Sequence, residues 1–89
     1  METEVLEDVQ LDELLTNQKE LILHNDDYNT FDHVIECLVA VCKHELTQAE
    51  QCAYIVHHNG KCSVKRGVES KLKPMYTALK NQNLTVELS

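Results

Sequence analysis

The pattern of apolar and polar positions in the first half of the chain predicts a strand followed by a helix. Residues 20–24 form a short, mostly apolar run that ends at the turn formers Asn25–Asp27, which is typical of a strand. After this turn, apolar side chains recur every three or four positions over residues 34–43, the spacing of one helix face. Thr30 is the predicted N-cap, and Asp32 lies in the first turn, where a carboxylate favours the helix dipole.

The second half contains signals for another helix and two more strands. Thr47–Glu50 has Thr followed three positions later by Glu, a capping box that predicts the start of a second helix. Asn59–Gly60 supplies a left-handed end for that helix. Residues 61–65 and residues 84–88 alternate between apolar and polar side chains, so each segment predicts a strand.

Between these two strands, apolar residues at helical spacing from Val68 to Leu79 predict a third helix. Pro74 falls inside this pattern. Because proline lacks an N–H and clashes with the preceding turn, either the helix begins late, with Pro74 in its first turn, or it is kinked there.

The predicted order is therefore strand, helix, helix, strand, helix, strand. This order indicates an α+β sandwich in which one three-stranded sheet packs against three helices. The chain of 89 residues suffices for one domain. We expect residues 18–89 to form this core and residues 1–17 to be a flexible acidic extension, either a disordered tail or a docking arm that orders on a partner.

Charge is distributed unevenly between these two parts. The formal net charge is −7, and the first 18 residues contain six acids and no base. Phosphate binding needs clustered Lys and Arg, so this acidic balance argues against a nucleic-acid partner. The one basic run, over residues 61–73, is interrupted by Glu69 and lacks interleaved aromatic residues.

The composition also bears on cofactors and on localisation. Trp is absent and aromatic residues are few, so the core must come from aliphatic residues and Cys, and no cofactor cavity is expected. The first twenty residues lack the basic start and apolar block of a signal peptide, and no apolar run approaches a membrane span. We therefore expect a cytoplasmic protein whose four cysteines are reduced.

Enzyme and metal chemistry are not favoured by the arrangement of reactive residues. Seven Cys and His residues could be ligands, but no pair has the Cys-x2-Cys or His-x3-His spacing of zinc modules: Cys37, Cys42, His44, Cys52, His57, His58 and Cys62. With two glycines in the chain, an oxyanion-hole loop for a Cys–His nucleophile is hard to build. Asp26 and Asp27 are adjacent on a turn and so point apart rather than across a substrate.

A binding site for a protonated amine fits the polar residues better. An ammonium group has three donors and no acceptor, so it needs acceptors from several directions. Asn25, Asp26 and His57 provide an amide oxygen, a carboxylate and a neutral imidazole nitrogen, and the carboxylate adds charge to its bond. Three apolar residues would lie beside them if the first two helices meet the turn: Val34, Ala53 and Val56. A peptide N-terminus fits such a site. A small interaction or scaffold domain without amine selectivity is the alternative.

Two segments of the chain form a recognisable pair: Leu23–Tyr28, followed by Val34, and Ala53–Lys61, with the sequence AYIVHHNGK. Together they resemble the ClpS family, whose members are small adaptors that deliver N-degron substrates to the Clp ATPase–protease. The two segments occur together at the family spacing, and the resemblance covers about residues 20–65. It implies a compact domain with a flexible N-terminal extension and no enzymatic activity.

The resemblance also implies a role for individual residues. Asn25, Asp26 and His57 match the residues that hold the substrate's α-amino group, and Asp27 matches a supporting carboxylate of the turn. Six residues match the hydrophobic pocket for a first residue Leu, Phe, Tyr or Trp: Asn29, Phe31, Val34, Ala53, Val56 and Leu84. Three of them depart from the family pattern, because Asn29 stands where many members have Thr, and Phe31 and Ala53 where many have Met.

The implied partners are N-degron proteins and the N-terminal domain of a ClpA- or ClpC-like AAA+ unfoldase. Glu69 is the positional match for a residue that contacts this ATPase, although the third-helix region is shorter than usual in the family. No nucleic-acid or membrane partner is expected, and we expect a monomer.

Overall fold

The computed structural model describes residues 18–89, and its elements follow the predicted order. They are β1 (Gln18–His24), α2 (Phe31–Cys42), α3 (Leu46–Asn59), β2 (Lys61–Val68), α4 (Glu69–Asn81) and β3 (Val86–Leu88). The predicted α+β architecture is confirmed. The acidic extension expected over residues 1–17 lies outside the described residues.

The sheet is antiparallel throughout, with β1 between β2 and β3. β2 extends three residues beyond the predicted end at residue 65, because it pairs with the whole of β1, from His24↔Lys61 to Gln18↔Val68. β3 is shorter than the predicted strand over residues 84–88. The N–H of Leu84 donates to the Leu79 carbonyl at 3.1 Å, so Leu84 belongs to the turn that ends α4.

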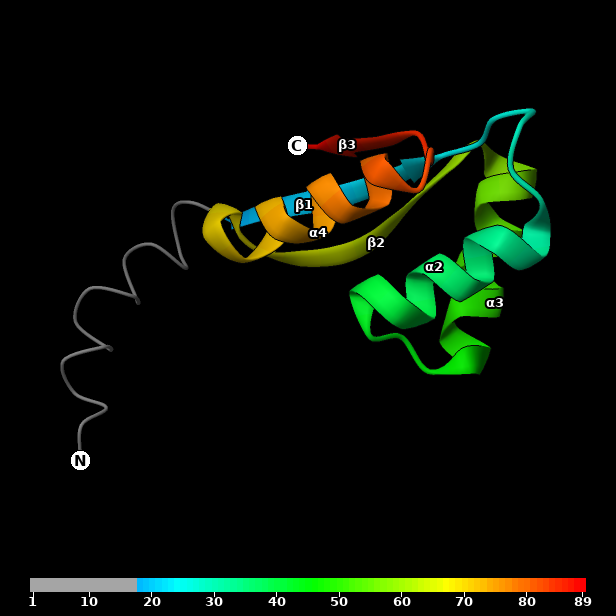
Figure 1. Cartoon of the computed structure of the whole chain (residues 1–89), viewed down its shortest axis with the longest axis horizontal. Coiled ribbons are helices and arrows are strands. Elements are labelled where there is room, and N and C mark those ends of the chain that lie inside the picture. The colour runs from blue at the N-terminus through cyan, green and yellow to red at the C-terminus, as the bar shows by residue number, and fades with distance from the viewer. Residues whose placement is uncertain (1–17) are drawn as a thin grey trace, which may run out of the picture.

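The helices occupy two different places around this sheet. Figure 1 shows α4 lying along the sheet, whereas α2 and α3 form a pair at one end of it. The largest fully buried side chains are those of Leu21, Leu23, Leu38, Cys42, Leu72 and Leu79. Leu38 and Cys42 belong to the helix pair, and the other four belong to the sheet and to α4. One continuous core of aliphatic and Cys side chains therefore joins the helix pair to the sheet. Among residues 18–89, no helix is long and apolar enough to cross a membrane.

The predicted start is right for α2 and wrong for α3. Thr30 caps α2, since its hydroxyl oxygen accepts the His33 N–H at 3.1 Å. The capping box at Thr47 does not form, because α3 begins at Leu46 with Glu45 as an N-cap that makes no side-chain bond. Lys43 ends α2 in the left-handed conformation, and the buried His44 donates through Nε2 to the Val64 carbonyl at 2.7 Å. This bond holds the loop immediately before α3 against β2.

The structure excludes one of the two alternatives for Pro74. α4 begins at Glu69, directly after β2, and Pro74 is its sixth residue, so a late start at Pro74 is wrong. Proline removes the hydrogen bond that its position would donate to the Ser70 carbonyl. Both residues are exposed, so water can take the place of that donor.

Gly60 ends α3 with a φ of +95°, in the left-handed region. Its N–H donates to the Val56 carbonyl at 2.9 Å, and its carbonyl accepts the Asn25 N–H at 2.8 Å. We expect Gly60→Ala to destabilise the fold by about 1–2 kcal/mol, because a Cβ disfavours this conformation even where it meets no atom. Urea unfolding would measure the loss.

Gly67→Ala is the matched control for this prediction. Gly67 does not have a positive φ, and a Cβ there would meet the Leu72 side chain at an ordinary contact distance of 3.9 Å. We expect little change or a small gain in stability. Equal losses for the two variants would show that left-handed backbone strain is not the cause at Gly60.

Candidate functional site

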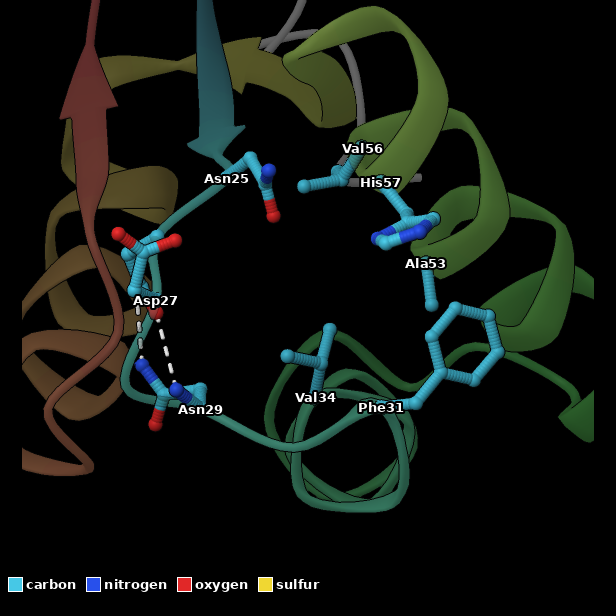
Figure 2. A pocket seen from close by; sticks show the side chains of 9 residues that line it. Asn25, Asp27, Asn29, Phe31, Val34, Ala53, Val56 and His57 are labelled. Atoms are coloured by element: carbon cyan, nitrogen blue, oxygen red, sulfur yellow. Dashed lines mark hydrogen bonds between the residues drawn. The ribbon is translucent and has the colours of Figure 1, made fainter.

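A cavity of about 250 Å³ lies where the turn after β1 meets α2 and α3. Figure 2 shows the turn on one side, α3 on the opposite side and the start of α2 between them. The lining residues are Asn25, Asp26, Asp27, Asn29, Phe31, Val34, Ala53, Val56 and His57. Every residue that the sequence analysis proposed for amine or side-chain binding is in this set, with the exception of Leu84.

Asp26 organises the turn that forms one side of the cavity. Its Oδ1 accepts the backbone N–H groups of Tyr28 and Asn29, at 2.9 and 3.0 Å. Its Oδ2 accepts the Asn29 side-chain amide at 2.9 Å and the Thr85 hydroxyl at 3.0 Å. An aspartate that bonds the backbone two residues ahead is typical of an Asx turn. The carboxylate is therefore fully used within the protein.

These hydrogen bonds also determine the ionisation of Asp26. Partial burial by itself raises the pKa of the carboxyl group, but the donors of Asn29, Tyr28 and Thr85 together outweigh it. The pKa of Asp26 is consequently lowered from its ordinary value of 3.8. All the groups that lower it are neutral donors, which favour the charged form by bonding to it.

Asn25 and Asp27 flank Asp26 and are left with exposed side chains at the cavity. The backbone N–H of Asn25 is bonded to the Gly60 carbonyl, so the end of α3 fixes its position. The Asp27 carboxylate makes no hydrogen bond or ion pair within residues 18–89. Asp26 and Asp27 both line the cavity, and they differ in that the Asp26 oxygens are bonded within the protein.

His57, in the last turn of α3, lies across the cavity from this turn (Figure 2). Its ring meets the Phe31 ring edge to face, with 6.4 Å between the centroids. Phe31 is 45% exposed and stands at the mouth. The apolar wall consists of Val34, which is partly buried, and of Ala53 and Val56, which are buried. The cavity thus has polar groups on two opposite sides and aliphatic groups between them.

Leu84 and Glu69 lie elsewhere in the structure. Leu84 is 4% exposed and packs in the hydrophobic core rather than against the cavity. Glu69 is the first residue of α4, exposed, with its carboxylate 4.0 Å from the ammonium of Lys73. Figure 1 shows this end of α4 at the opposite end of the sheet from α2 and α3.

Asn83 and Thr85 also contact the turn, and neither is among the residues predicted from the sequence. Thr85 bonds Asp26, and the Asn83 carbonyl accepts the Asn29 side-chain amide at 2.9 Å. Both residues are more than fifty positions away along the chain. A pairing over such a separation gives no local signal in a single sequence.

Cys42 and Cys62 do not have the lowered pKa that is typical of a nucleophilic thiol. Burial raises the pKa values of Cys42 and Cys62 to about 11, so both thiols are protonated near neutral pH. All four cysteines are free thiols. Within the described part of the chain, no three His, Cys, Asp or Glu side chains are grouped to hold a metal ion.

The fold and this cavity define a small α+β binding domain whose site joins polar groups to an apolar wall. The family model described as ATP-dependent Clp protease adaptor protein ClpS matches residues 16–87, so the chain belongs to the ClpS family. The resemblance found in the sequence is thereby confirmed. The family is one of protease adaptors, which agrees with the prediction that the chain is not an enzyme.

Two relatives carry the same description. The chain is 38% identical over 60 residues to a ClpS adapter of Campylobacter jejuni subsp. doylei, covering 67% of this chain and 60% of that protein. It is 40% identical over 58 residues to one of Campylobacter jejuni subsp. jejuni, covering 65% and 58%. These matches thus span about 60% of the length of the curated relatives.

A solved structure shares the fold. Agrobacterium tumefaciens ClpS2, determined bound to L-phenylalaninamide, superposes with a TM-score of 0.69 at 22% identity. The match covers 82% of this chain and 95% of that one.

The lowered pKa of Asp26 leads to a prediction about stability and pH. A carboxyl group whose pKa is lower in the folded state stabilises the fold above its unfolded pKa, and that contribution is lost as the pH falls through the folded value. We expect the native chain to be more stable than Asp26→Asn at neutral pH. The difference should shrink as the pH falls below 3.8, the ordinary value.

Urea unfolding of both proteins over this pH range would measure the difference. Asp27→Asn, one position further along the same turn, is a matched control, because the exposed Asp27 carboxylate accepts no hydrogen bond within residues 18–89. A stability difference for Asp26→Asn that does not change with pH would contradict the role of the ionised carboxylate.

Proposed function

We propose that this protein is an adaptor that binds proteins whose first residue is Leu, Phe, Tyr or Trp and delivers them to a Clp-type AAA+ unfoldase for degradation. One observation supports this proposal above the others. Asn25 and Asp27 lie across the cavity from His57, and the aliphatic side chains of Val34, Ala53 and Val56 line the same cavity. Acceptors on two sides and an apolar wall match a free α-amino group with a hydrophobic side chain beside it.

The acceptors fit an ammonium group in number and in kind. An ammonium has three donors, and an amide oxygen, a carboxylate and a neutral imidazole nitrogen are three acceptors. We assign the charged bond to Asp27, since both oxygens of Asp26 are already occupied by four donors of the turn. Asp26 would then keep Asn25 and Asp27 in place. This exchanges the roles that the sequence resemblance implies for the two carboxylates.

The cavity suits one side chain rather than a larger ligand. Its volume of about 250 Å³ is below the roughly 300–1,000 Å³ of sites for drug-sized molecules. Val34, Ala53 and Val56 offer the apolar contact, and the exposed Phe31 ring borders the entrance. L-phenylalaninamide, the ligand of Agrobacterium tumefaciens ClpS2, combines a free α-amine with a benzyl side chain. It is therefore a model for the ligand proposed here.

Delivery requires a second surface, away from the cavity. We assign it to the exposed start of α4, where Glu69 would contact the N-terminal domain of a ClpA- or ClpC-like unfoldase. Because α4 begins at the far end of the sheet from α2 and α3, a monomer would hold substrate and ATPase at the same time (Figure 1). The acidic residues 1–17, as an extension of the core over residues 18–89, would assist the hand-over.

The first test is the affinity of the full chain for peptides that differ in residue one alone. We expect peptides beginning with Leu, Phe, Tyr or Trp to bind, and peptides beginning with Asp or Gly not to bind. Acetylation of the N-terminus removes the charge and two donors, so acetylated peptides should lose binding. Fluorescence anisotropy with a labelled peptide would measure both effects.

The acetylated peptides separate this function from its alternative. If acetylated and free peptides bound equally, the cavity would belong to an interaction domain without amine selectivity. If no peptide bound at any first residue, the adaptor proposal itself would fail.

The second test concerns the acceptors. A hydrogen bond to a charged group contributes roughly 1.5–3 kcal/mol, so Asp27→Asn and His57→Ala should each weaken peptide binding by about 10- to 100-fold. Isothermal titration with a peptide beginning with Phe would measure the change. Neither variant removes a side chain from the core, since both residues are exposed.

Each of the two variants has a matched control. Asp32→Asn removes an exposed carboxylate close to the turn, and His58→Ala removes the imidazole that follows His57; neither residue lines the cavity. We expect both controls to bind like the native chain. Equal losses in the controls and the test variants would contradict a direct role for Asp27 and His57.

A further inference from the structure

The turn that carries the proposed amine site is held by a segment near the other end of the chain, residues 82–85. Thr85 donates its hydroxyl to Asp26 Oδ2 at 3.0 Å, and its carbonyl accepts the His24 N–H at 2.8 Å. The Asn83 carbonyl accepts the Asn29 side-chain amide at 2.9 Å. These hydrogen bonds therefore hold the backbone just before the turn, at His24, and the side chains of Asp26 and Asn29 within it.

Two of these bonds share one side chain and form a closed clamp. The Asn29 side-chain amide has two hydrogens, and its nitrogen lies 2.9 Å from both Asp26 Oδ2 and the Asn83 carbonyl. Asp26 Oδ2 also accepts the Thr85 hydroxyl. The bonded path thus runs from Asn83 through Asn29 and Asp26 to Thr85, and the backbone closes it.

The fold holds the segment that carries this clamp in one position. Asn83 has a φ of +68°, a left-handed conformation that Asn tolerates better than most residues. Its N–H donates to the Lys80 carbonyl at 2.9 Å, so it continues directly from the end of α4. Leu84, between Asn83 and Thr85, is buried in the core. Thr85 therefore presents its hydroxyl from a fixed backbone.

We propose that Thr85 is a positioning residue for amine recognition, acting through Asp26 and not touching the substrate. The inference rests on the proposed function. The Thr85 hydroxyl is the fourth donor to Asp26, and it helps to keep that carboxylate bonded to the turn. Asn25 and Asp27, on either side of Asp26, are thereby directed to the cavity. A specific Thr hydroxyl far along the chain thus sets the geometry of the binding turn.

The test compares Thr85→Val, Thr85→Ser and the native full chain. Val keeps the shape of Thr without the hydroxyl, and Ser keeps the hydroxyl, so Val should weaken binding of a peptide beginning with Phe about three- to tenfold and Ser should restore it. Thr85 is exposed, which allows both substitutions. Thr77→Val is the matched control, since Thr77 is exposed on α4 and makes no hydrogen bond through its hydroxyl within residues 18–89.

A second readout does not depend on any ligand. NMR titration of the Asp26 carboxyl carbon should show a higher pKa in Thr85→Val than in the native chain, because one donor that lowers it is lost. The pKa should return towards the native value in Thr85→Ser. A merely structural effect of the substitution would not follow the hydroxyl in this way.

The outcomes separate this inference from the proposed function. If the native chain binds no peptide, the adaptor function fails, while the Asp26 titration still tests the clamp. If the native chain and Thr85→Val bind equally, Thr85 does not position the site. If Val weakens binding but Ser does not restore it and the Asp26 pKa does not change, the loss arises from packing and the proposal is overturned.

Discussion

The carboxylate of Asp26 is the group on which the candidate site depends. Its four hydrogen bonds tie together the backbone of the turn, the Asn29 side chain and the segment before β3. A turn of polar residues next to an apolar cavity has little apolar burial to hold it, so hydrogen bonds to an ionised acceptor must define its shape. The oxygens of Asp26 are taken up by these four bonds, whereas the side chains of Asn25 and Asp27 are exposed at the cavity.

Asp26 and Asp27 have the same side chain but different surroundings, so they can have different roles. Asp26 is satisfied by neutral donors, whereas Asp27 is exposed at the cavity and has no partner within residues 18–89. In the proposed function, Asp26 shapes the turn and Asp27 binds the positively charged amine of the substrate. The exposed acceptor suits a ligand that brings its own positive charge, since no cation of the described part of the chain neutralises it there.

The helix pair that forms the rest of the site depends on a different anchor. His44 is buried between α2 and α3 and bonds to the Val64 carbonyl, which connects the helix pair to β2. At the other end of α3, Gly60 connects the helix to Asn25. His57 and Ala53 are thus held relative to the turn by contacts at both ends of their helix.

The sequence by itself determined the order of the elements, the Thr30 cap and most of the lining residues, because periodicity, caps and turn formers act over a few neighbouring positions. The family resemblance brought distant motifs together. The tertiary structure decided the rest: that α3 starts at Leu46, that Leu84 is in the core, and that Asp26 rather than Asp27 is bonded within the protein. Some of its contacts join residues far apart along the chain, such as His44 with Val64 or Asp26 with Thr85. A hydrogen bond between residues dozens of positions apart is fixed by how the whole chain packs, and local sequence carries no record of it.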